Sequence, residues 1–203
     1  MYTFESHVLL DGNIGLINPG VHADVHYIME SFADTDGLII DLRQHPHFGF
    51  ESAILQYLLE EPMPYLYLSK PSRNAPGKRF HMSQRHQIPQ SPYTFIFDRS
   101  VVLLVDLRTF GVSERVVMSL LVAPNVTVIG PYTMGAVGNV ARLPLPGNID
   151  MLFTSLGVYN PAGEQTFRVG IIPDIRIDRT IQGITDGRDE IMEAAIQFIL
   201  GER

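Results

Sequence analysis

Residues 101–121 read VVLLVDLRTFGVSERVVMSLL, and this stretch decides how the rest of the chain is interpreted. Residues 101–105 are a continuous apolar run, which is typical of a strand that is buried on both faces. After a turn at residues 106–111, apolar residues recur at helical spacing from Val112 to Leu121, which predicts a helix with one apolar face. A buried strand that turns sharply into a helix is where α/β enzymes often place a nucleophile, because the N–H groups at the helix start stabilise an anion.

The same strand-then-helix pattern occurs elsewhere in the chain. Residues 37–43 (GLIIDLR) and 126–130 (VTVIG) are short apolar runs. We expect them to be buried neighbours of the 101–105 strand, with a helix over residues 112–122 packed on one face. This alternation predicts an α/β fold. The other predicted elements are a hairpin over residues 7–10 and 14–18 around Asp11-Gly12-Asn13, helices over 21–32, 50–59 and 188–200, and strands over 65–69, 142–144 and 151–159.

Residues 70–91 differ in composition from the segments around them. They are rich in Pro, Asn, Arg and His, and they include the only two lysines of the chain, Lys70 and Lys78. This composition predicts a long loop or flap that buries little surface. We therefore expect limited proteolysis to cut there before it cuts the core.

Length and composition exclude several classes of protein. The 203 residues predict a single domain over residues 1–203, because this length is enough for one sizeable core. A net charge of −7 without a basic run argues against a nucleic-acid partner. The absence of cysteine excludes thiol nucleophiles, disulfides and thiolate metal sites. No stretch predicts a membrane span, and the start MYTFESHVLL does not have the pattern of a signal peptide, so the compartment stays open.

Six stretches in order resemble the tail-specific (C-terminal processing) serine protease family. They are GNIGLINPG, TDGLIIDLR, VVLLVDLRTFGVSE, VTVIGPYTMGAVG, LGVYNPAGEQTFRVGIIPDI and DEIMEAAIQFIL. The resemblance implies a ClpP/crotonase-like α/β spiral of strand–strand–helix units. It also implies a serine nucleophile that cleaves near protein C-termini, no cofactor, and a peptide or unfolded protein C-terminus as partner, with a homo-oligomer allowed. Family members usually carry an N-terminal helical region and a PDZ domain, which these residues do not show, and they are often periplasmic or secreted.

The catalytic positions that the resemblance implies hold unusual residues. The family pattern T-x-S-x-x-E matches Thr109 and Glu114, but Gly111 stands at the nucleophile position and Ala136 at the position of the lysine base. The oxyanion-hole region corresponds to Gln44, His45, Pro46, His47 and Gly49. Proline has no N–H to donate to an oxyanion. We therefore expect weakened or lost peptidase activity, with a peptide or partner still bound along the cleft edge by strand addition.

Two alternatives stay open. Ser113 could act as a displaced nucleophile with His45 or His47 as its base, although a serine in a first helical turn also serves to cap the helix. Glu114 could likewise be a first-turn acid that favours the helix dipole without any role in catalysis. The second alternative is a crotonase-like acyl-CoA enzyme, in which two backbone N–H groups hold a thioester oxyanion.

A metal site is a weaker interpretation of the same region. His45 and His47 form a His-x-His pair close to Asp41, a spacing that some zinc sites use. The sequence offers no third ligand that can be assigned, and we favour the interpretation that the pair belongs to an exposed polar turn after a strand. We therefore predict no metal.

Overall fold

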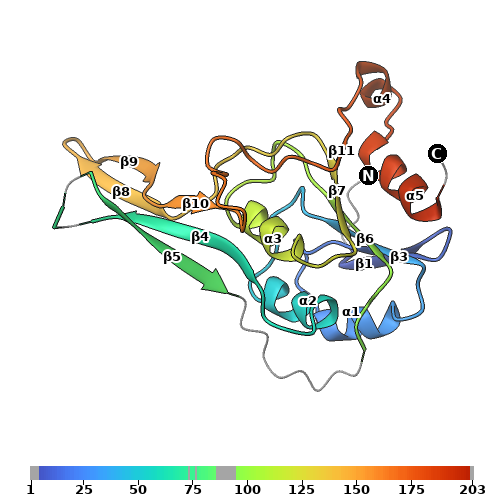
Figure 1. Ribbon diagram of the computed structural model, residues 1–203. Helices are drawn as coiled ribbons and strands as arrows, with labels where there is room; N and C mark the ends of the chain where they lie inside the picture. The colour runs from blue at the N-terminus through green and yellow to red at the C-terminus, as the bar shows by residue number, and fades with distance from the viewer. Residues whose placement is uncertain (1–4, 73, 76, 86–94, 202–203) are drawn as a thin grey trace.

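The computed structural model describes residues 5–72, 74, 75, 77–85 and 95–201 (Figure 1). Its centre is a six-stranded sheet in the order β1-β2-β3-β6-β7-β11. The hairpin of β1 and β2 is antiparallel, and the remaining neighbours pair in parallel. The strands are β1 (His7–Leu10), β2 (Ile14–Ile17), β3 (Gly37–Asp41), β6 (Ser100–Leu104), β7 (Val126–Gly130) and β11 (Ile175–Arg176).

The three apolar runs of the sequence are neighbouring strands, as predicted. Strand β6 pairs with β3 on one side and β7 on the other, so that Leu103 lies between Ile40 and Val128. On one sheet face these side chains belong to a core shared with helices α1 (Val25–Ser31), α2 (Phe50–Leu58) and α3 (Val112–Leu120). On the other face Ile39, Val102, Leu104 and Ile129 pack with Ile191 and Ala195 of α5 (Glu190–Leu200). Both faces are covered, which explains why these strands lack polar alternation.

Side-chain caps set where the helices begin. The Asp24 carboxylate accepts a hydrogen bond from the His26 N–H, so α1 begins at Val25 and not at the predicted residue 21. Asp189 accepts one from the Met192 N–H at the start of α5. A short helix that the sequence did not predict, α4 (Ile181–Thr185), precedes α5. No helix within the described residues is long and apolar enough to cross a membrane.

Two hairpins project beyond the central sheet (Figure 1). Strand β4 (Pro64–Pro71) pairs with β5 (Arg79–Arg85) and with β10 (Gly157–Tyr159) to form a three-stranded sheet. The expected long loop over residues 70–91 is therefore wrong for residues 70, 71 and 79–85, which form strands because β4 and β5 pair with each other. Residues 73, 76 and 86–91 lie outside the described residues. The second hairpin consists of β8 (Val140–Leu145) and β9 (Ile149–Thr154). The predicted single strand over 151–159 is thus divided between β9 and β10.

Candidate active site

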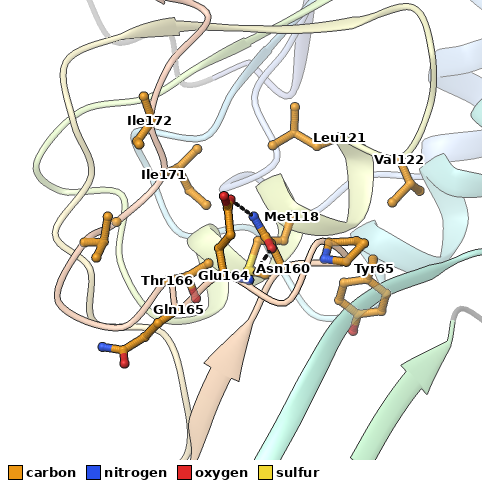
Figure 2. Close-up of a pocket in the computed structure, with 13 residues that line it drawn as sticks. Tyr65, Met118, Leu121, Val122, Asn160, Glu164, Gln165, Thr166, Ile171 and Ile172 are labelled. Carbon is orange, nitrogen blue, oxygen red and sulfur yellow. Dashed lines mark hydrogen bonds between the residues drawn. The ribbon is translucent and has the colours of Figure 1, made fainter.

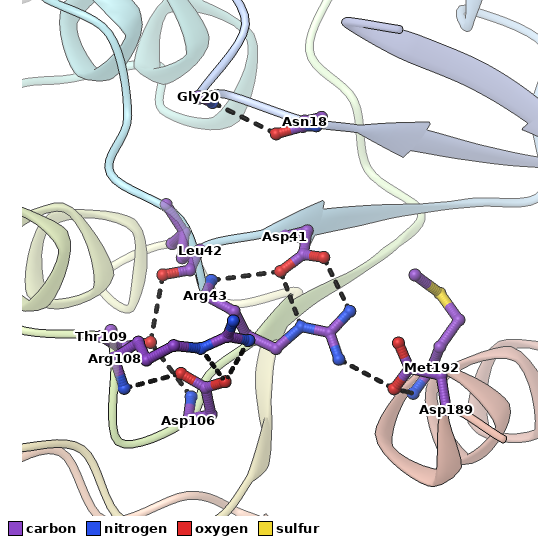
Figure 3. A network of polar contacts seen from close by, with 10 residues as sticks. All are labelled: Asn18, Gly20, Asp41, Leu42, Arg43, Asp106, Arg108, Thr109, Asp189 and Met192. Carbon is purple, nitrogen blue, oxygen red and sulfur yellow. Dashed lines mark hydrogen bonds and ion pairs between the residues drawn. The ribbon is translucent and has the colours of Figure 1, made fainter. Parts of the chain in front are cut away.

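The turn that follows β6 is tied to the end of β3 by one threonine. The hydroxyl of Thr109 donates a hydrogen bond to the Leu42 carbonyl at 3.0 Å and accepts one from the Asp106 N–H at 3.0 Å (Figure 3). The Thr109 carbonyl accepts a further bond from the Met134 N–H at 3.2 Å. Because Thr109 is completely buried, these bonds fix the turn against two neighbouring segments.

Gly111 lies at the end of this turn, immediately before α3. Its backbone has φ 57° and ψ −109°, a conformation that residues with a side chain rarely adopt. A Cβ placed on Gly111 meets no atom of the described chain within 4 Å. Gly111 borders a cleft of about 400 Å³ whose other walls come from β4, from the start of α3 and from residues 137–139 and 156–158. The turn therefore leaves space for a side chain at the edge of the cleft, although the backbone conformation of Gly111 would strain one, and the sequence supplies none.

Glu114 connects this turn to the loop that contains Ala136. Its carboxylate is completely buried and accepts hydrogen bonds from four groups. These are the N–H of Gly111 at 3.2 Å, the hydroxyl of Thr133 at 2.5 Å, and the N–H groups of Gly135 at 2.7 Å and Ala136 at 2.9 Å. The structure thus brings Ala136 next to Gly111 and Glu114, although Ala136 lies 22 residues after Glu114 in the sequence. Thr133, which the sequence did not single out, also accepts a bond from the Ile171 N–H at 2.8 Å.

Ser113 and His45 form the serine–histidine contact that the sequence left open. The Ser113 Oγ lies 3.1 Å from Nδ1 of His45, and the His45 ring lies 4.8 Å from the ring of Phe110. Ser113 has no exposed surface, whereas His45 is exposed. The contact has suitable hydrogen-bond geometry for a base and a nucleophile. A nucleophile must also be reachable by its substrate, and the Ser113 hydroxyl is covered.

Two positions in the loop over residues 44–49 have no N–H to offer to an oxyanion. Pro46 has none, and the His47 N–H donates to the Pro19 carbonyl at 2.7 Å. Gln44 lies against Gly20, and Gly49 adopts φ 91° immediately before α2. The His47 ring lies 4.8 Å from that of His22. In the part of the chain that the structure describes, no three His, Asp or Glu side chains are placed to hold a metal ion.

A buried ion-pair network lies beside the turn, at the carboxyl end of β3 (Figure 3). Arg43 binds Asp41 through two parallel hydrogen bonds of 2.8 and 2.7 Å, and it reaches Asp189 at 2.8 Å. Burial alone would lower the pKa of Arg43, but its bonds to the two carboxylates raise it above its ordinary value. Burial would raise the pKa of Asp189, and the hydrogen bond from Arg43 reverses this and lowers it. This network fastens α5 to the central sheet.

A second ion pair lies between the cleft and a neighbouring pocket. Arg115 pairs with Glu51 at 2.5 Å, and its guanidinium lies 3.4 Å from the Tyr65 hydroxyl. Burial raises the pKa of Glu51, while Arg115 opposes this shift. The neighbouring pocket has a volume of about 560 Å³ and is lined mainly by apolar side chains (Figure 2). Arg115 belongs to the wall of the cleft, and Tyr65 belongs to the wall of this pocket.

Comparison with known proteins places this geometry in a family. A family model described as peptidase family S41 matches residues 13–177. A protein from Parabacteroides merdae ATCC 43184, provisionally assigned as a peptidase, has a TM-score of 0.84 at 24% identity, over 96% of this chain and 64% of that one. Mature CPAF complexed with lactacystin has a TM-score of 0.68 at 14% identity, over 93% of this chain and 52% of that one. The photosystem II D1 C-terminal processing protease has a TM-score of 0.55 at 16% identity, over 84% of this chain and 45% of that one.

The family match and these likenesses confirm the predicted fold class. The chain has the ClpP/crotonase-like α/β fold of tail-specific proteases. The structural likenesses, all at low identity, show a shared fold and no more. The chain spans 64% of the length of the Parabacteroides merdae protein and about half the length of CPAF.

Proposed function

The chain belongs to peptidase family S41, and from this premise we propose that it binds a peptide or an unfolded protein C-terminus with weak or no serine peptidase activity. The observation that carries the proposal is Gly111. The turn, the helix start and the buried Glu114 are all in place around it, but the position that borders the cleft has no hydroxyl. One structural relative is a C-terminal processing protease, which supports a peptide as the ligand class.

Serine chemistry needs three groups; the family positions lack the hydroxyl and the base, and the oxyanion loop offers fewer N–H donors. A hydroxyl must be deprotonated by a base within about 3 Å, and N–H donors must point at the developing oxyanion. Gly111 and Ala136 have no such side chains, and the Ala136 N–H is already bonded to Glu114. In the loop over residues 44–49, Pro46 and His47 have no N–H free to donate. All three requirements are thus affected together.

Peptide binding needs only the cleft. Its walls include Leu66 and Leu68 of β4, Val137, and Val158 of β10, so it suits an apolar side chain of an extended peptide. Arg115 lies in the same wall, half-exposed, and gives the cleft a cation already paired with Glu51. None of these groups depends on a nucleophile.

The chemical half of the proposal is tested with a fluorophosphonate probe and a peptidase assay. We expect no labelling of the wild-type chain and no turnover above background. Gly111→Ser alone should not restore activity, because the new hydroxyl still lacks a base. Loss of one oxyanion donor alone typically costs about 10²–10³ in rate. Stoichiometric labelling of the wild type would show that a nucleophile survives.

The binding half is tested by fluorescence anisotropy. The probe is a labelled, unstructured peptide with an apolar C-terminal residue, and the comparison is the same peptide with an amidated C-terminus. Val112→Phe should fill part of the cleft and weaken binding at least about 10-fold, which corresponds to about 1.4 kcal/mol. Leu107→Phe is the matched control, because Leu107 is exposed and does not line this cleft. Equal affinity for wild type and Val112→Phe would contradict the proposed site.

The 3.1 Å contact between Ser113 and His45 supports a second candidate function, an active hydrolase with a displaced nucleophile. In that case the fluorophosphonate would label the wild type, and Ser113→Ala would abolish the labelling. We favour the first proposal because Ser113 has no exposed surface. We do not propose acyl-CoA chemistry, since the chain belongs to a peptidase family.

A further inference from the structure

The cleft beside Gly111 contains one charged group, and that group is a cation. Among the described residues that line the cleft, Arg115 alone has an ionisable side chain, so no carboxylate is found in the wall. The whole chain has 22 acidic and 15 basic residues, and a hollow with a cation and no acid runs against this overall charge. A single cation among apolar side chains suits a ligand that combines one negative charge with one apolar group.

The ion pair of Arg115 is oriented with the cation toward the cleft. The Arg115 side chain is 39% exposed and lines the cleft, whereas the Glu51 side chain is 14% exposed and does not line it. Burial alone would lower the pKa of Arg115, but Glu51 and Tyr65 raise it above its ordinary value, so the guanidinium stays charged. Glu51 thus supports the cation from behind the wall of the cleft.

One side of the Arg115 guanidinium is held, and the other is open. The ion pair with Glu51 at 2.5 Å and the contact with the Tyr65 hydroxyl at 3.4 Å both use Nη1. Nε and Nη2 form no hydrogen bond with the part of the chain that the structure describes. Two parallel N–H groups on one side of a guanidinium match the two oxygens of a carboxylate.

Arg43 shows in the same protein how such a guanidinium is completed. Its Nη1 binds one carboxylate, that of Asp189, at 2.8 Å. Its Nε and Nη2 bind the two oxygens of a second carboxylate, that of Asp41, at 2.8 and 2.7 Å. Arg115 has the first kind of partner, Glu51 on Nη1, and lacks the second among the described residues. A carboxylate from a ligand would complete it in the same way.

We propose that Arg115 binds the α-carboxylate of a peptide's last residue through Nε and Nη2, while the side chain of that residue lies among the apolar side chains of the cleft. The ligand is then a free chain end, because only a terminal residue combines an apolar side chain with a carboxylate. An internal segment offers an uncharged carbonyl at this position. The inference rests on the proposed peptide-binding function, and it adds the group that distinguishes a chain end from the rest of an extended chain.

The test measures how strongly each variant prefers a free acid over an amide. The probes are a labelled peptide with a C-terminal leucine and the same peptide amidated, compared by fluorescence anisotropy. The wild type should bind the acid about 10- to 100-fold more tightly, which is the range of a hydrogen bond to a charged group. Arg115→Gln should bind the two peptides within about 3-fold of each other. Arg188→Gln is the matched control and should keep the wild-type ratio, because Arg188 pairs with Glu193 and does not line the cleft.

Glu51→Gln tests the same assignment without removing the cation. An amide at residue 51 still accepts a hydrogen bond from Nη1 but no longer neutralises Arg115, so the preference for the acid should rise. A ratio that falls would contradict the assignment. This variant decides the question if Arg115→Gln, which leaves Glu51 without its partner, does not fold, and thermal unfolding shows whether each variant is folded.

The outcomes separate this inference from the function on which it rests. If the wild type binds acid and amide equally and Val112→Phe weakens both, the peptide site stands and the role of Arg115 is wrong. A preference for the acid that survives in folded Arg115→Gln also overturns that role. If neither peptide binds, the proposed function fails and the inference fails with it. An amidated peptide ending in aspartate that binds as tightly as the free acid would show that a side-chain carboxylate, and not a chain end, is the ligand.

Discussion

Replacing Glu114 with glutamine gives the sharpest test of how the candidate site is held together. Each carboxylate oxygen accepts two hydrogen bonds, one oxygen from Thr133 and Gly135 and the other from Gly111 and Ala136. An amide keeps only one of these oxygens. Whichever way it is turned, its NH₂ group faces at least one backbone N–H, so up to two buried donors lose their acceptor. At about 1–3 kcal/mol for each buried group left unsatisfied, we expect a loss of about 2–5 kcal/mol in the free energy of unfolding.

The measurement is urea unfolding followed by circular dichroism, with the midpoint and slope fitted separately. Glu164→Gln is the matched control, because Glu164 is exposed and accepts a hydrogen bond from the Asn160 side chain. The control should lie within about 0.5 kcal/mol of the wild type. If Glu114→Gln is equally close to the wild type, with an unchanged slope, the four hydrogen bonds do not hold the site as argued.

Two further predictions concern the contacts around β3. Thr109→Val keeps the shape of the side chain but leaves the Leu42 carbonyl and the Asp106 N–H without their partner. The free energy of unfolding, measured in urea, should therefore fall by about 1–3 kcal/mol for each of these groups. The pKa of Asp189 is lowered in the folded protein, so its stabilising contribution is present above its unfolded pKa and is lost as the pH falls through its lower folded value. In a pH series below about pH 4, Asp189→Asn should therefore lose less stability than the wild type, and a parallel loss in both proteins would contradict this assignment.

Much of the central sheet could be predicted because its information is local. The apolar runs at residues 37–43, 101–105 and 126–130 have no polar alternation, and burial on both faces is the physical cause of that pattern. Strand β5 could not be predicted in the same way. Residues 79–85 (RFHMSQR) show no apolar run, and they form a strand because β4 lies alongside them. β4 and β5 are consecutive strands of a hairpin, and a strand that forms through backbone pairing with its neighbour, without a regular apolar face, leaves no periodicity in the sequence.

The candidate site was predicted in part. The turn and its Glu114 follow from a motif, but the groups that hold the carboxylate come from a loop about 20 residues further on. Thr133 is one of several threonines in the sequence, and nothing local marks it as a ligand of a buried acid. The position of Asp189 against Arg43 is also non-local, since they are separated by 146 residues. Such contacts follow from the packing of the fold and not from spacing along the chain.

The presence of Glu114 does not by itself argue for catalysis. Its donors are three backbone N–H groups and one hydroxyl, and together they join the turn at Gly111 to the loop at Ala136. These hydrogen bonds are needed whether or not residue 111 is a nucleophile, because removing the carboxylate would leave buried donors unsatisfied. A chain that has lost its serine would therefore still be expected to keep the glutamate. Catalysis depends on residues 111 and 136 themselves. The double variant Gly111→Ser with Ala136→Lys adds a hydroxyl and a base at these two positions, which Glu114 already holds next to each other.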